Sequence, residues 1–449
     1  MTDIDISRRW RQIDSPRTEL GRFATTGPVA WTASRIGGAI TGGGRVHAIE
    51  AIGLVPGLAK YYGVFFGYVN SLAGLSRFDS ELIILRTAWT AGSYYEWFQH
   101  VHVSRIAGLT VRDVARVAAG PDADGWDERQ RALLTAVDEL VAYRCVSDAT
   151  WAALREFYDD RRMADLCLLT GNYAMLAMLL NSVGAAVEDG GWQSRAMRWL
   201  RRGEATAGVL DRMRPDIACD TCPAVPPPPT HGVDDDADQA TAIARLSAAS
   251  HWGVGDSGRV ALGGFRDTGL LAWLLSRAGG AITRGGSVAA ADALGVDPRM
   301  MRHYLPFAAK LVLGSRLPRR DAELATLRIA WNSGVRYEWY YHAHLSRLGG
   351  LTLGEVERAA AGPLAPGWPE RERALLTAVD ELYSARCISD ATWTLLRGHY
   401  SERELAALCV LVGYYDMLAM LFRSFGVEPE PGALRRGPLA RLRSRRVTA

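Results

Sequence analysis

The stretch ELIILRTAWTAGSYYEWFQHVHVSRIAGL at residues 81–109 returns as ELATLRIAWNSGVRYEWYYHAHLSRLGGL at residues 323–351, and sixteen of the 29 positions are identical. An offset of 242 residues, from Glu96 to Glu338, relates the two copies without a gap. A constant offset of this kind indicates a tandem duplication. Any chemistry in this segment is therefore present twice in the chain.

The repeat divides the 449 residues into two units with a polar segment between them. That segment contains a proline run and an aspartate cluster, which cannot bury a core. Its Cys219 and Cys222 form a single C-x-x-C pair, which alone is weak support for zinc or redox chemistry. The predicted boundaries are 7–203 for the first unit, 204–247 for the linker, 248–434 for the second unit and 435–449 for a basic C-terminal tail.

The composition, with 48% hydrophobic and 22% charged residues and a net charge of +3, indicates a globular protein and does not imply a nucleic-acid partner. The first ten residues lack the apolar core of a signal peptide. The most apolar runs, 166–183 and 408–425, are interrupted by polar residues, and the second holds Asp416 and Arg423. We therefore expect buried helices rather than membrane spans, and a cytoplasmic location.

Helical periodicity dominates both units. The string RALLTAVDEL occurs at 131–140 and again at 373–382. In its first copy the apolar residues fall on one helix face. With no convincing alternating strand, we predict an all-α protein made of two helical bundles in a pseudo-twofold relation, with six to eight helices per unit.

The repeated segment also carries ionisable residues. Glu81 falls on a helix that ends near Gly92, and a second helix from about Ser93 carries Glu96 and His100. Residues four apart share a helix face, so we interpret Glu96 and His100 as an acid–base pair that faces a pocket. Glu81 is a second candidate if the two helices bring it close.

The same catalytic roles fall on Glu323, Glu338 and His342 in the second copy. Aromatic residues next to these groups are predicted to form an apolar wall for a small-molecule substrate. They are Trp89, Tyr95 and Trp97 in the first copy, and Trp331, Tyr337 and Trp339 in the second.

Three other interpretations compete with acid–base chemistry. Ser93 and Glu96 fit a capping box, although Val335 replaces the serine in the second copy while Glu338 remains. The Glu–His pairs also fit structural ion pairs. Glu81, Glu96 and His100 could bind a metal, but one well-aimed histidine per copy is fewer than common catalytic sites use. We expect neither a metal nor a cofactor.

The string L-R-x-A-W-x-x-G-x-x-Y-E-W-x-x-H, followed by R-A-L-L-x-A-V-D-E-L, resembles the carboxymuconolactone decarboxylase family, which shares the alkylhydroperoxidase D-like all-α fold. The peroxidase branch of that superfamily has a C-x-x-C pair, and its two cysteines fall here on Ser93 and Glu96. In the second copy they fall on Val335 and Glu338. A dithiol peroxidase needs both thiols, so that mechanism is excluded at these positions.

The decarboxylase branch, which lacks the cysteine pair, works without a cofactor. The resemblance implies that His100 and His342 are acid–base groups supported by the four glutamates. We predict a decarboxylase, lactone hydrolase or isomerase type of enzyme acting on a small enolisable carboxylate or cyclic metabolite. The alternative is a non-catalytic helical binding or scaffold protein. The family also implies rings of six units, and hence a homotrimer of this chain.

The two copies have diverged near this segment. Tyr341 replaces Gln99, and Asp416 replaces Ala174. We therefore expect two pockets with different linings. One could keep the catalytic activity while the other only binds a ligand or acts as a scaffold.

Overall fold

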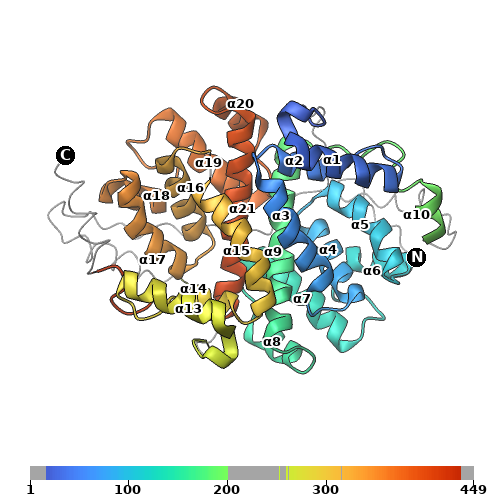
Figure 1. Ribbon diagram of the computed structural model, residues 1–449, viewed down its shortest axis with the longest axis horizontal. Helices are drawn as coiled ribbons and strands as arrows, with labels where there is room; N and C mark the ends of the chain where they lie inside the picture. The colour runs from blue at the N-terminus through green and yellow to red at the C-terminus, as the bar shows by residue number, and fades with distance from the viewer. Residues whose placement is uncertain (1–16, 201–251, 253–258, 261, 315, 436–449) are drawn as a thin grey trace.

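The computed structural model describes residues 17–200, 252, 259–260, 262–314 and 316–435 (Figure 1). These residues form helices and turns, and no strand occurs among them, which confirms the predicted all-α class. The predicted linker with Cys219 and Cys222 lies outside the described residues. Nearly all of the predicted tail lies outside them as well.

The described residues of each unit form more helices than predicted, because short helices such as α2 leave no periodic pattern to read. The first unit contains α1 (Phe23–Thr41), α2 (His47–Gly53), α3 (Leu58–Gly67), the π-helix η1 (Tyr68–Leu72), α4 (Arg77–Thr90), α5 (Tyr94–Ile106), α6 (Val111–Ala119), α7 (Glu128–Tyr143), α8 (Asp148–Arg155), α9 (Asp160–Val183) and α10 (Arg195–Leu200). The second contains α13 (Phe265–Thr283), α14 (Ala289–Leu294), α15 (Pro298–Leu313), α16 (Arg319–Asn332), α17 (Arg336–Leu345), the 3-10 helix η2 (Ser346–Gly349), α18 (Leu353–Ala361), α19 (Glu370–Ala385), α20 (Asp390–Arg397) and α21 (Glu402–Ser424).

Local sequence explains where several helices begin. Ser147 caps α8 by accepting a hydrogen bond from the Thr150 amide, and Ser389 caps α20 in the same way. The predicted apolar face of α7 is buried, and its residues are Leu133, Leu134, Val137, Leu140 and Val141. Capping and periodicity therefore set these helices before tertiary packing is considered.

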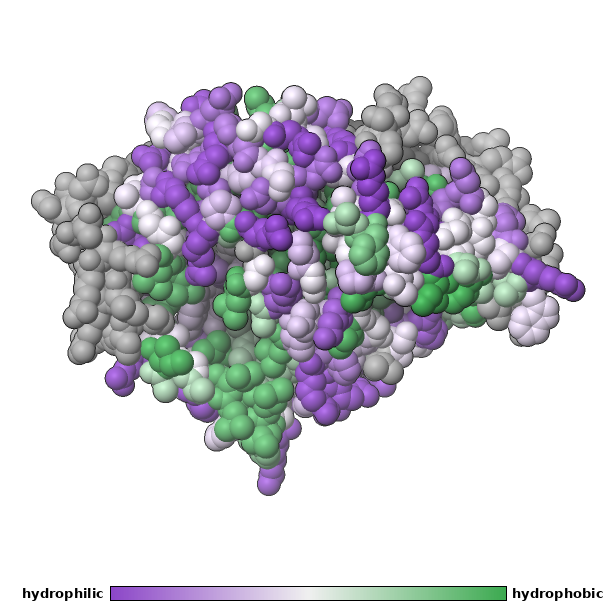
Figure 2. Space-filling view, turned by 45° about the horizontal axis from the view of Figure 1, so that its top comes forward, coloured by the Kyte–Doolittle hydropathy of each residue, from purple (hydrophilic) through white to green (hydrophobic). Residues whose placement is uncertain are grey.

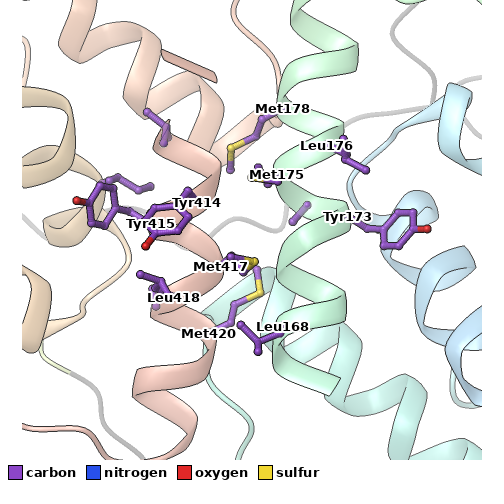
Figure 3. Packing of buried hydrophobic residues seen from close by; sticks show 14 of the residues in the cluster. Leu168, Tyr173, Met175, Leu176, Met178, Tyr414, Tyr415, Met417, Leu418 and Met420 are labelled. Atoms are coloured by element: carbon purple, nitrogen blue, oxygen red, sulfur yellow. The ribbon is translucent and has the colours of Figure 1, made fainter. Parts of the chain in front are cut away.

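The long helices α9 and α21 lie side by side at the centre, with one unit on each side (Figure 1). Met175 and Met417 lie between the two helices, whereas Tyr173 and Tyr415 point away into their own units (Figure 3). By length and composition both helices could cross a membrane, but the apolar window of each is entirely buried inside the protein. They form the interface between the two units, which explains their apolar sequence.

Close contact between α9 and α21 depends on two glycines. A Cβ atom at Gly171 would lie 2.6 Å from Cα of Met417, and one at Gly413 would lie 2.7 Å from Cα of Met175. These two contacts exchange under the repeat offset, as the pseudo-twofold relation requires.

Polar contacts across the interface follow the same symmetry. The Arg144 guanidinium donates to the carbonyl of Tyr383 at 2.9 Å, and Arg386 donates to the carbonyl of Val141 at 3.0 Å. The pairing breaks at Asp416, whose counterpart is Ala174. Asp416 lies 2.8 Å from Arg144 and 3.1 Å from Arg386, and it is fully buried.

Burial alone would raise the pKa of Asp416, but the two guanidinium groups outweigh it and hold that pKa below its usual value. Because the pKa of Asp416 is lower in the folded state, the carboxylate stabilises the fold at pH values above its unfolded-state pKa. This contribution is lost as the pH falls through the folded-state pKa.

The Asp416→Ala variant, which installs the residue of the first copy, should lower the free energy of unfolding by about 3–5 kcal/mol, because two buried guanidinium groups lose the carboxylate that they share. Denaturant titration at neutral pH measures the loss. Asp390→Ala is the matched control: Asp390 pairs with Arg17 but its side chain is 82% exposed, so we expect a change below about 1 kcal/mol. Equal losses in both variants would contradict this role of Asp416.

Helices α1 and α13, which are repeat counterparts, expose apolar faces. Figure 2 shows a hydrophobic area at the lower edge of the molecule, in the region where Figure 1 places α13. Exposed apolar patches of this kind are typical of interaction surfaces. The exposed apolar residues are Phe23, Val29, Ile36 and Ile40 on α1, and Phe265, Leu270, Leu274 and Ile282 on α13.

Candidate functional site

A cavity of about 320 Å³ lies in the first unit among α1, α2, α3, α5 and α9. This volume is at the low end of the range for small-molecule sites. Glu96 and His100 both line it, and most of its wall is apolar. The lining residues are Val29, Ala30, Ala33, Val46, Ala48, Ile49, Ile52, Ala59, Tyr62, Gly63, Phe66, Tyr95, Glu96, Gln99, His100, Tyr173, Leu176 and Leu180.

The imidazole of His100, on α5, is held by two other helices. Its Nδ1 atom lies 2.9 Å from Oε2 of Glu81 on α4, and its Nε2 atom lies 3.0 Å from the hydroxyl of Tyr173 on α9. The predicted pairing of Glu96 with His100 is therefore wrong. The acidic partner is Glu81, because α4 packs against α5 and brings the carboxylate to the imidazole.

The hydrogen bonds around His100 can hold or release one proton. A carboxylate only accepts, so Nδ1 carries a hydrogen toward Glu81. The Asn70 amide donates to the Phe66 carbonyl at 2.9 Å, which leaves its oxygen to accept the Tyr173 hydroxyl at 2.7 Å. All partners are then satisfied by an imidazolium whose Nε2 donates to Tyr173. When that proton leaves, Nε2 can accept the hydroxyl instead.

Glu96 faces the same cavity without a partner. It is 3% exposed, and neither carboxylate oxygen has a hydrogen bond of ordinary geometry to the described residues. Burial raises the pKa of Glu96 well above its usual value, and the nearby Ser93 hydroxyl offsets this only in part. Burial thus favours the neutral carboxylic acid. Ser93 is the N-cap residue of α5 but makes no side-chain capping bond, so the capping-box interpretation is wrong.

The Glu96→Gln variant should become more stable than the parent as pH rises. The pKa of Glu96 is raised on folding, so stability falls as pH increases from the unfolded value near 4.5 through the folded value. The glutamine side chain has the same shape as that of Glu96 but no carboxyl proton to lose in this pH range. Calorimetry should give equal melting temperatures near pH 4 and an advantage of about 1–3 °C for the variant at pH 8. A lower melting temperature at every pH would instead indicate a structural ion pair.

Arg86 and Arg328 are structural residues. Arg86 binds Asp138 through two hydrogen bonds of 2.6 and 2.7 Å, and Arg328 binds Asp380 in the same way. Both aspartates belong to the repeated RALLTAVDEL string. These arginines therefore fix α4 to α7 and α16 to α19, and neither guanidinium is left for a substrate.

Four of the predicted aromatic contacts are core residues. Trp89 and Trp97 pack with ring centroids 5.0 Å apart, and Trp331 and Trp339 do so at 4.9 Å. All four are buried, and neither Trp89 nor Trp97 lines the cavity described above. Trp89 and Trp97 therefore lie outside the wall of this cavity, and the predicted substrate contact of Trp331 and Trp339 stays a prediction. Tyr95 does line the cavity.

Tyr95 belongs to a network around Glu188, which sequence reasoning missed. Glu188 accepts hydrogen bonds from the Tyr95 hydroxyl at 2.5 Å, the His47 amide at 2.6 Å and Gln99 at 2.8 Å. The segment after α9 is thereby tied to α2 and α5 at one end of the cavity. Two signals for the missed residues were present, since the repeat offset joins Glu188 to Glu430 and Tyr173 to Tyr415.

The second unit keeps the imidazole and its carboxylate. Nδ1 of His342 lies 2.9 Å from Oε2 of Glu323, and the His342 ring meets the Tyr415 ring edge-on at 5.0 Å. Burial would raise the pKa of Glu323, but His342 and Arg319 outweigh it, and that pKa lies below its usual value. Glu338 is buried like Glu96, with its pKa raised by burial and by Asp416.

Side chains around this second Glu–His pair differ in size from those in the first unit. Met301 and Leu305 stand where the first cavity is lined by Ala59 and Gly63. Phe422 likewise replaces Leu180. Its ring packs edge-on against Tyr337 at 5.5 Å, and Tyr337 is the counterpart of Tyr95. The second unit therefore carries larger side chains at these three positions, whereas Ala291 and Ala308 replace the larger Ile49 and Phe66.

The described cysteines are structural in character. Cys145, Cys167, Cys387 and Cys409 form no disulfide bond with one another. Burial raises the pKa of Cys167 and of Cys409 to about 12, which disfavours the reactive thiolate. Among the described residues, no three or more His, Cys, Asp or Glu side chains are arranged to hold a metal ion.

Fold and site together define a tandem, all-helical protein with a Glu–His pair in each half. Residues 56–139 and 298–381 each match the model of the carboxymuconolactone decarboxylase family. The chain therefore carries two domains of this family in tandem, as the repeated motif predicted. No curated protein and no solved structure among those compared matches the chain.

Proposed function

We propose that the first unit is an acid–base enzyme that needs no cofactor and moves a proton on a small enolisable compound bound in its cavity. The observation that carries this proposal is the convergence of two different groups on one cavity. His100 is fixed by Glu81 and Tyr173, and Glu96 is a buried carboxyl that has, among the described residues, no hydrogen bond of ordinary geometry. A general acid and a general base in one site are what enolisation requires.

The residues have separate roles in this mechanism. Tyr173 takes a proton from the carbon next to a carbonyl group while its own hydroxyl proton passes to Nε2 of a neutral His100, the nitrogen that Glu81 does not hold. Tyr173 lies 3.0 Å from that nitrogen and can pass a proton to or from it. Glu96, as a neutral acid, donates to the oxygen on which negative charge develops. Decarboxylation of a β-keto acid and isomerisation next to a carbonyl both pass through such an enol, and lactone opening does so when it proceeds by β-elimination.

For the second unit we propose a supporting role, which is the scaffold alternative applied to one half of the chain. The bulkier side chains at 301, 305 and 422 favour this assignment. So does Asp416, because it joins the second unit to the interface arginines.

Hydrogen exchange tests the proposed chemistry. The full chain is incubated in D₂O with a panel of cyclic ketones, lactones and keto acids, and loss of the hydrogen next to each carbonyl is followed by NMR. We expect at least one compound to exchange faster with the parent protein than with the Glu81→Gln variant, in which the imidazole loses its anionic partner. Identical rates with protein and with buffer, for every compound, would contradict the proposal.

We also propose a cytoplasmic homotrimer that assembles through the apolar faces of α1 and α13. The two faces are repeat counterparts, so three chains present six such faces, which pair into three contacts around a ring. Sedimentation at the mass of three chains is the expected result, and a stable monomer would contradict it.

A further inference from the structure

The wall of the first-unit cavity contains no arginine or lysine side chain among its described residues. The nearest guanidinium in the Glu–His network is that of Arg77. It lies 3.6 Å from Glu81, is half exposed and does not line the cavity. A buried anion needs a cation or several donors to offset the loss of water. A carboxylate substrate would find neither in this wall.

His100 does not supply the missing positive charge. Whenever its ring is protonated, the Glu81 carboxylate lies 2.9 Å from Nδ1 and balances it. Glu188, the other acid near the cavity, already accepts from Tyr95, Gln99 and the His47 amide. The hydrogen-bonding groups left for a ligand are therefore few, and the buried Glu96 carboxyl is the most prominent.

The volume of the cavity and its mainly apolar wall also favour an uncharged ligand. A volume of about 320 Å³ holds a small ring compound. Aliphatic and aromatic side chains form most of the wall. At Gly63 no atom lies within 4 Å of where a Cβ would stand, so the cavity reaches the backbone of α3 there.

We infer that this cavity takes an uncharged, mainly apolar cyclic carbonyl compound, and that it discriminates against carboxylate anions. The inference rests on the proposed function and narrows its substrate class. The carbonyl oxygen accepts from Glu96, and the adjacent C–H bond faces the Tyr173 oxygen. The proton moves from carbon to that oxygen while the Tyr173 hydroxyl proton moves to Nε2 of a neutral His100. The electron pair becomes the C=C bond of the enol, and the carbonyl oxygen takes the Glu96 proton. The reverse transfers, to the same carbon or to a conjugated one, restore these groups without a co-reactant.

Matched ligands test the inference by calorimetry on the full chain at neutral pH. The probes are cyclohexanone and 4-oxocyclohexanecarboxylate, which share a ring and a ketone and differ by one carboxylate. We expect the ketone to bind at least about ten-fold more tightly, a difference of the size that an uncompensated buried charge produces. Equal or tighter binding of the keto acid, or no binding of either probe, would overturn the inference.

Residues of the second unit can be placed in the first-unit cavity as variants that fill it. Gly63→Leu and Ala59→Met place the residues of the second unit in the first-unit cavity, and each should abolish ketone binding. Leu305→Ala, in the second unit, should leave binding unchanged. Two filling variants on different turns of α3 guard against a single folding defect, which circular dichroism also checks. Ketone binding that survives both would place the ligand elsewhere and overturn the inference.

The binding experiment tests the ligand class and the hydrogen-exchange experiment tests the proposed function, so the two can fail independently. If the ketone binds as expected but exchanges no hydrogen, the ligand class stands and the proposed function fails. If the keto acid exchanges faster than the ketone, the proposed function stands and the ligand class fails.

Discussion

The His100→Ala variant should lose about 10²–10⁴-fold in the rate of enzyme-dependent hydrogen exchange, which is the usual contribution of a positioned acid–base group. The matched variant His342→Ala should lose less than about threefold, because we propose a supporting role for the second unit, in which larger residues stand at 301, 305 and 422. The comparison is sharp because the two histidines have the same Glu partner geometry, 2.9 Å in each unit. The measurement is NMR-detected exchange at saturating ketone.

Melting temperatures of both variants serve as the control for folding. A loss of activity in His342→Ala that equals the loss in His100→Ala, at unchanged stability, would mean that both units work. A double variant with full activity would contradict the whole mechanism.

The second large effect is expected at the glycines of the central interface. Gly171→Val should lower the free energy of unfolding by about 3 kcal/mol or more, because its Cβ would stand 2.6 Å from the backbone of Met417 and cannot be accommodated by a side-chain shift. Gly413→Val should have an effect of similar size against Met175. The two helices carry the interface between the units, so we also expect a broader unfolding transition.

Gly67→Ala is the control for these variants, since nothing lies within 4 Å of its ideal Cβ and its backbone is helical. We expect it to be neutral or slightly stabilising. Differential scanning calorimetry measures all three. A Gly171→Val melting temperature equal to that of the parent would show that α9 and α21 are not packed this closely.

Much of the architecture could be predicted from the sequence, for physical reasons that are local. The repeat offset showed two units, and apolar periodicity showed the face of α7. The polar interruptions in 166–183 and 408–425 indicated buried helices rather than membrane spans. The short helices could not be predicted, because a helix such as α10, with six residues, is stabilised by packing rather than by its own pattern.

The sequence indicated the ionisable residues of the site, but not which carboxylate is hydrogen-bonded to His100. Spacing within α5 places Glu96 and His100 on one side, yet the imidazole binds Glu81, because tertiary packing of α4 decides which carboxylate reaches it. Tyr173 lies 73 positions from His100 and has no local signal. Trp89 and Trp97 lay beside the site in sequence, but their size favoured burial in the core.

The structure of the full chain crystallised with cyclohexanone tests the central claim most directly. We predict the ketone in the first-unit cavity, with its oxygen at hydrogen-bond distance from the Glu96 carboxyl and an adjacent carbon facing the Tyr173 hydroxyl that is hydrogen-bonded to Nε2 of His100. A ligand absent from that cavity at saturating concentration, or bound there with its carbonyl turned away from Glu96 and His100, would contradict the claim.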